Sequence, residues 1–162
     1  MRILGIDPGT AITGYGIIDK HFNNFSVVDY GSIQTKAHTP MEERLCMIYD
    51  GMRWLIKEYQ PDEIAVEELF FNRNVTTAIT VGQARGVIIL AAAQLGVKVN
   101  EYTPLQVKQA ITGYGNAEKK QVQYMVKNIL GLAKVPQPDD VADALAIAIC
   151  HSNWLQSRDW GK

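Results

Sequence analysis

The sequence is poor in cysteine, has no long apolar run and carries almost no net charge. Its two cysteines, Cys46 and Cys150, form no Cys-x-x-Cys motif and lie in apolar helical contexts, so we expect two core thiols in a reducing compartment. No stretch approaches the roughly 18 uncharged apolar residues of a membrane span, and the N-terminal apolar run is too short for a signal peptide. These absences predict a cytoplasmic protein with no membrane partner.

The net charge is only −1, because 16 lysines and arginines face 17 acidic residues. The whole chain is therefore not drawn to nucleic acid, and any such affinity must come from a local excess of positive charge. Such an excess exists between residues 98 and 134, where six lysines face two acids and leave a local charge of +4. Solvated helix faces would account for Lys127 and Lys134, whereas Lys108 and Lys119 lie in motifs considered below.

The length of 162 residues suits one compact domain. Short apolar runs at 3–6, 15–18 and 25–28, separated by turn residues, predict three antiparallel strands. A helix is predicted from Pro40 to Pro61. Strands at 63–67 and 97–102 with a helix over 75–95 between them predict a right-handed βαβ unit with parallel strands. Another helix is predicted to begin at Thr103-Pro104, and two more at 118–130 and from 141 to about 155.

Two acidic residues end predicted strands, Asp7 after the first and Glu67 after the fourth. Each has an ordinary interpretation, Asp7 as the start of an Asp-Pro-Gly turn and Glu67 as a solvated strand end. In open α/β sheets, however, sites form beyond the carboxyl ends of parallel strands, so the two carboxylates would share one crevice.

The segment 139–146 supplies further carboxylates at the start of the last helix. Asp139 suits a first-turn position that favours the helix dipole. Asp140 and Asp143 are spaced i, i+3 and share one helix face, and Asp143 lies one turn inside among alanines. Four carboxylates from three segments suit Mg²⁺, because hard divalent cations prefer oxygen ligands. A metal pair in such a site would hydrolyse a phosphodiester by activating water and stabilising the leaving oxygen.

Ordered motifs extend along nearly the whole chain. Together they resemble the bacterial RuvC family of Holliday-junction resolvases; they are Gly5–Thr10, Thr13–Gly16, Ala65–Glu67, Gly82–Gly86, Gln106–Gln109, Ala117–Lys119 and Asp140–Ala146. The resemblance implies a ribonuclease-H-like fold over residues 1–152, a five-stranded mixed sheet with helices on both faces. Residues 153–162, which include Trp154 and Trp160, match nothing in that pattern and are predicted to form a flexible tail.

The same resemblance implies the chemistry and the partners. Asp7, Glu67, Asp140 and Asp143 would be the catalytic ligands of two Mg²⁺ ions, for which Mn²⁺ could substitute. Lys108 and Lys119 would contact the junction backbone, and Phe70, with Phe71 or Leu69 turned inward, would stack on a base. The implied assembly is a homodimer on a four-way DNA junction, with RuvA and RuvB as branch-migration partners.

Several alternatives stay open at this point. The helix around Gly82, Gly86 and Ala91–Ala93 suits close packing on the sheet as well as a dimer contact, and Arg85 suits either role. The glycine-rich start also resembles the phosphate hairpin of actin-like and Hsp70-like ATPases, which need two such domains. A related nuclease acting on RNA and a catalytically silent junction-binding module are the other candidates.

Overall fold

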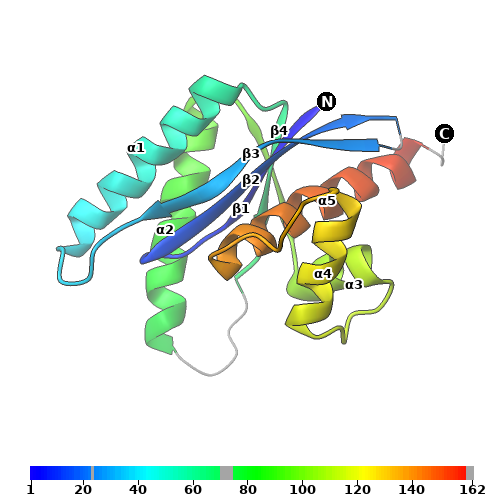
Figure 1. Ribbon diagram of the computed structural model, residues 1–162. Coiled ribbons are helices and arrows are strands. Elements are labelled where there is room, and N and C mark those ends of the chain that lie inside the picture. The colour runs from blue at the N-terminus through cyan, green and yellow to red at the C-terminus, as the bar shows by residue number, and fades with distance from the viewer. Residues whose placement is uncertain (23, 70–74, 160–162) are drawn as a thin grey trace.

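The computed structural model describes residues 1–22, 24–69 and 75–159 and is built around one mixed sheet (Figure 1). The strand order is β3-β2-β1-β4-β5. Strand β1 pairs antiparallel with β2 and parallel with β4. Strand β3 pairs antiparallel with β2, and β5 pairs parallel with β4. The strands are β1 (Arg2–Asp7), β2 (Ile12–His21), β3 (Asn24–Gln34), β4 (Glu63–Glu67) and β5 (Lys98–Tyr102). This is the mixed five-stranded sheet that the sequence and the resemblance predict.

Helices cover both faces of the sheet (Figure 1). Helices α1 and α2 pack together on one face, and α5 crosses the other face with α3 and α4 outside it. The bounds are α1 (Met41–Tyr59), α2 (Val75–Gln94), α3 (Pro104–Thr112), α4 (Lys119–Ile129) and α5 (Asp139–Asp159). Each face therefore has its own apolar core with the central strands shared between them.

Local sequence explains where the helices begin and end. Thr103 caps α3, because its hydroxyl accepts from the Gln106 amide while the Gln106 side chain accepts from the Thr103 amide. Gln121 binds the Glu118 amide at 2.8 Å at the start of α4. These contacts fix the two short helices that border the candidate site.

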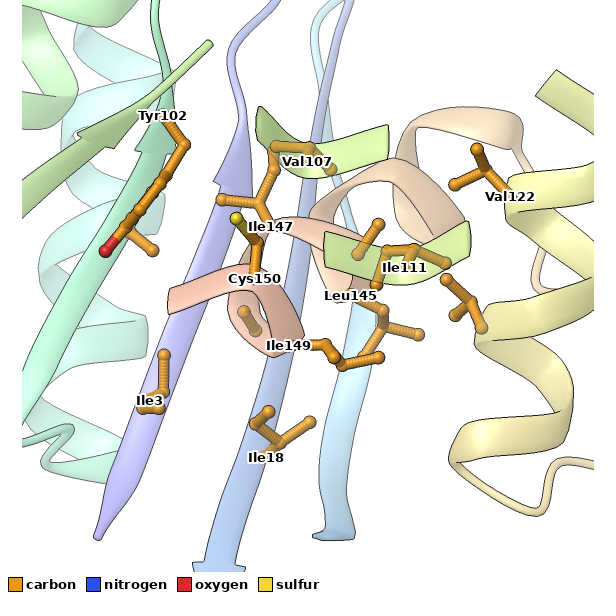
Figure 2. Close-up of a cluster of buried hydrophobic side chains, with 14 of the residues drawn as sticks. Ile3, Ile18, Tyr102, Val107, Ile111, Val122, Leu145, Ile147, Ile149 and Cys150 are labelled. Carbon is orange, nitrogen blue, oxygen red and sulfur yellow. The ribbon is translucent and has the colours of Figure 1, made fainter. Parts of the chain in front are cut away.

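The apolar pattern of β1 divides between the two cores. Ile3 faces the α5 side, together with Leu145, Ile147 and Ile149 of that helix (Figure 2). The neighbouring Leu4 faces the α1 and α2 side. The alternation of side chains along a strand explains this division. The edge of the sheet that carries the acidic residues is consequently held from both faces.

Glycines allow α5 to lie directly against the sheet backbone. A Cβ on Gly14 would overlap the Asp140 carbonyl oxygen, and a Cβ on Gly16 would lie 2.6 Å from the Leu145 side chain. A Cβ on Gly5 would lie 2.8 Å from the Ala148 amide nitrogen. The glycine-rich motifs of the first two strands thus permit the close approach that brings the start of α5 to the end of β1.

Two sequence-based expectations differ from the structure. Cys46 is exposed rather than in the core, whereas Cys150 is buried and its burial raises the pKa of the thiol to about 12. Helix α5 continues to Asp159, beyond the end predicted near residue 155, and the flexible tail over 153–162 stays a prediction. The Asn153 side-chain amide donates to the Ala110 carbonyl at 3.4 Å, so Asn153 is in contact with α3.

We predict that Gly14→Ala destabilises the protein by about 1–3 kcal/mol, because the added methyl group must push the first turn of α5 away from β2. Urea unfolding followed by circular dichroism measures this change. An unaltered midpoint would show that the Gly14–Asp140 approach is not a packing constraint.

Candidate active site

The ends of β1 and β4 place two carboxylates side by side. Asp7 is the last residue of β1 and Glu67 the last of β4. The two strands are parallel neighbours, and the pair Ile6↔Val66 precedes the two acids. Asp7 and Glu67 therefore emerge at the same sheet edge, where the sequence analysis expects them.

Helix α5 adds the remaining acids to this edge. Gly14, which pairs with Asp7 in the sheet, is the residue against which the Asp140 backbone packs. The negative charges of Asp140 and Asp143 both raise the pKa of Asp7, and that of Asp143 also raises the pKa of Glu67. All four predicted acids are thus close enough to interact electrostatically. Asp140 affects the pKa of Asp7 but not that of Glu67.

Burial and mutual repulsion make this group of acids reluctant to ionise. Burial, followed by repulsion from Glu67, Asp143 and Asp140, raises the pKa of Asp7 to about 8. Burial and the Asp143 charge raise the pKa of Glu67 to about 7. Burial also raises the pKa of Asp143, against the opposing effect of its hydrogen bond with Lys119. A bound cation would relieve this repulsion, and perturbed carboxylates of this kind mark functional sites.

The structure brings both predicted lysines to the acids. Lys119 Nζ lies 3.1 Å from Asp143 Oδ2 and 3.4 Å from Asp139 Oδ2. Lys108 lies close enough to lower the pKa of Glu67. The sequence pattern indicates only a helix start for Asp139 and only DNA binding for Lys119, and it does not reveal their ion pairs. No local pattern signals them, because each pair joins two separate helices.

A cavity of about 190 Å³ opens beside these residues between β4, α3, α4 and α5. Two acids and two lysines line it together with four apolar residues. The lining residues are Glu67, Lys108, Lys119 and Asp143 with Pro104, Val107, Val122 and Ala146. The mixture of acids and bases suits a phosphate ester that approaches a cation.

The donor set fits Mg²⁺ in its chemistry, because it consists of carboxylate oxygens that repel one another. Within residues 1–22, 24–69 and 75–159, no three His, Cys, Asp or Glu side chains stand close enough to enclose one ion in their present rotamers. Asp143 is instead held by Lys119. Phe70, the predicted base-stacking residue, lies outside the described residues.

Comparison with known proteins decides the family. The profile of the crossover junction endodeoxyribonuclease RuvC matches residues 3–151. The chain belongs to the RuvC family. It is 65% identical over 153 residues to the crossover junction endodeoxyribonuclease RuvC of Desulfitobacterium hafniense, covering 94% of this chain and 93% of the relative. The corresponding Brevibacillus brevis RuvC is 63% identical over 154 residues, or 95% and 93% of the two chains.

Solved structures agree with the family and the fold. A Thermus thermophilus RuvC structure, 38% identical, superposes with a TM-score of 0.88 over 97% of this chain and 96% of that one. The T. thermophilus RuvC in complex with a Holliday junction substrate superposes with a TM-score of 0.92 at the same identity and coverage. The protein is therefore a RuvC-type endodeoxyribonuclease, a hydrolase with the ribonuclease-H-like fold.

The raised pKa of Asp7 predicts how the metal-free protein responds to pH. The pKa of Asp7 is about 3.8 in the unfolded chain, the ordinary value of an aspartate, and about 8 in the folded protein. The stability of the folded state should therefore fall as pH rises through this interval, because the unfolded state then binds fewer protons. Asp7→Asn removes the ionising group and should raise the melting temperature above that of the wild type at pH 8 but not at pH 4.

Thermal unfolding in a chelating buffer at the two pH values checks this difference. For a domain of this size, each kcal/mol of relief raises the midpoint by about 2–4 °C. Asp50→Asn, which removes an exposed acid of α1, is the control and should behave like the wild type at both pH values. Equal midpoints for Asp7→Asn and the wild type at pH 8 would contradict the repulsion inferred here.

Proposed function

We propose that the protein resolves four-way DNA junctions by Mg²⁺-dependent hydrolysis of phosphodiester bonds on opposite strands. The observation that carries this proposal is the group of mutually repelling carboxylates at the ends of β1 and β4, bordered by Lys108 and Lys119. The relative of known structure that was solved with a Holliday junction supports the choice of substrate.

The residues divide into a cation-holding set and a DNA-holding set. Asp7, Glu67, Asp140 and Asp143 would hold Mg²⁺, which when bound lowers the pKa of water and stabilises the leaving oxygen. The ammonium groups of Lys108 and Lys119 would bind phosphates next to the scissile bond. The apolar side chains of Val107 and Val122 line the same cavity, and a less polar surrounding strengthens interactions between charges.

Single amide substitutions test the cation-holding set. Asp7→Asn, Glu67→Gln and Asp143→Asn should each abolish cleavage of a labelled junction while leaving junction affinity within a few fold, because the shape of each side chain is retained. Asp139→Asn is the matched control on the same helix turn and should retain most of the activity. Mg²⁺-dependent cleavage by Asp7→Asn would contradict the assignment. Duplex, single-stranded and RNA–DNA hybrid substrates in the same assay test the alternative of a nuclease acting on RNA.

Lys108 tests the DNA-holding set. Lys108→Ala should weaken junction binding and reduce the slope of log affinity against log salt by about 0.9 per lost phosphate contact in each protomer. Lys127→Ala, in the last turn of α4 and in the same positively charged segment, is the control and should leave the slope nearly unchanged. An unaltered slope in Lys108→Ala would mean that its ammonium does not bind phosphate.

Helix α2 supports the proposal of a homodimer. It is the one helix in the described part of the chain that is long and apolar enough by composition to cross a membrane. Only 22% of its apolar 18-residue segment is buried within the domain. As the crossover between paired strands β4 and β5, it is a helix of the folded domain. Val75, Ile79 and Leu90 are 70%, 56% and 50% exposed, and helical spacing places them along one stripe with Gly82 and Gly86.

A second copy would cover this stripe, because a two-fold axis matches one apolar helix face with itself. Two active sites related by this axis would also suit paired cuts in a symmetric junction. Arg85 serves the fold within the chain, since its guanidinium forms a 2.6 Å ion pair with Glu101 of β5. The packing interpretation of Arg85 is therefore the one that its contacts support.

We predict that Ile79→Glu halves the mass measured by sedimentation equilibrium, because a buried charge at the two-fold axis would face its own copy. Tyr124→Glu, which alters a residue 60% exposed on α4, should remain dimeric. If Ile79→Glu and the wild type have the same mass, α2 does not form the interface.

The resemblance to the family alone supports three further parts of the proposal. Phe70, three residues after Glu67, would stack on a base near the scissile phosphate. RuvA and RuvB would be the branch-migration partners, and the protein would act in the cytoplasm. Each stays a prediction.

A further inference from the structure

Lys119 is the positive charge most closely tied to the carboxylates. It is the first residue of α4, and its ammonium spans two acids of α5, Asp143 at 3.1 Å and Asp139 at 3.4 Å. The side chain of Lys119 is 55% exposed and that of Asp143 is 30% exposed. The ion pair is therefore partly open to solvent.

The charge of Lys119 acts on three of the four acids. It lowers the pKa of Asp7, Glu67 and Asp143. Of these three acids, Lys108 lowers the pKa of Glu67 only. Removing Lys119 would thus leave a set of neighbouring carboxylates without their closest counter-charge. Lys108 offers a matched comparison, because it lines the same cavity without an ion pair to Asp143.

An ammonium and a divalent cation that share one carboxylate oxygen repel each other, because both are positively charged and close together. Asp143 Oδ2 is engaged by Lys119. A cation that uses this oxygen therefore competes with the ammonium for it. The four-carbon stem of a half-exposed lysine can swing aside without moving α4.

We propose that Lys119 is an internal counter-ion of the metal-free carboxylates, which competes with the divalent cation for Asp143 and, once displaced, becomes free to bind a DNA phosphate. This inference rests on the proposed role of Asp143 as a cation ligand. It gives Lys119 two alternating partners. By linkage, a phosphate that draws Lys119 away from Asp143 raises the affinity for the cation, and the cation raises the affinity for DNA.

Calorimetric titration of the DNA-free protein with Mg²⁺ tests the competition directly. The titration is made above pH 8, the pKa of Asp7, so that protons compete less for the carboxylates. Lys119→Met should bind Mg²⁺ about 5- to 10-fold more tightly than the wild type, a change within the usual range of coupling between two bound groups. Lys119→Arg, which keeps the charge, should remain near the wild type.

Lys108→Met is the control for the loss of one positive charge from the cavity and should change the affinity much less than Lys119→Met. In the absence of divalent ions, Lys119→Met should also melt at a lower temperature than the wild type, and saturating Mg²⁺ should reduce that difference. Equal or weaker Mg²⁺ binding by Lys119→Met would overturn the proposal.

Asp143→Asn separates this inference from the proposed function. If the wild type binds Mg²⁺ and Asp143→Asn binds it weakly, while Lys119→Met equals the wild type, only the competition by Lys119 is refuted. If Asp143→Asn binds Mg²⁺ as tightly as the wild type, the role of Asp143 as a ligand fails and the inference fails with it.

Discussion

The repulsion among carboxylates at one edge of the sheet is the constraint on which the site depends. Asp7 and Glu67 end adjacent parallel strands, and Asp143 reaches the same edge from α5. Burial makes each negative charge more costly, which is why the pKa of Asp7 rises to about 8. Keeping these acids together lowers the folding stability of the protein and creates a site that favours a cation.

The two cores and the glycine contacts hold the acids in place against this repulsion. Ile3 and Leu4 bury opposite faces of β1 in different cores, so Asp7 follows a strand fixed from both sides. Gly14 lets α5 approach until the Asp140 backbone touches β2. The positions of the acids therefore depend on apolar packing and close backbone contact, and Lys119 supplies a compensating charge beside Asp143.

The arrangement of Asp7 and Glu67 could be predicted from the sequence, because two short apolar strands end in acids and parallel strands share an edge. The i, i+3 spacing of Asp140 and Asp143 likewise predicts a common helix face. The ion pair of Lys119 with Asp143 could not be predicted, because it depends on how two separate helices pack. The exposure of Cys46 and the continuation of α5 to Asp159 were also missed, since apolar neighbours and a weak terminal pattern do not determine burial or helix length.

The most direct test of the central claim is the anomalous scattering of Mn²⁺ in crystals of the wild-type protein. We predict anomalous density between the side chains of Asp7, Glu67 and Asp143 at the carboxyl ends of β1 and β4. Crystals soaked to saturation that show Mn²⁺ only elsewhere, with these carboxylates in their present positions, would contradict a cation site at this edge of the sheet.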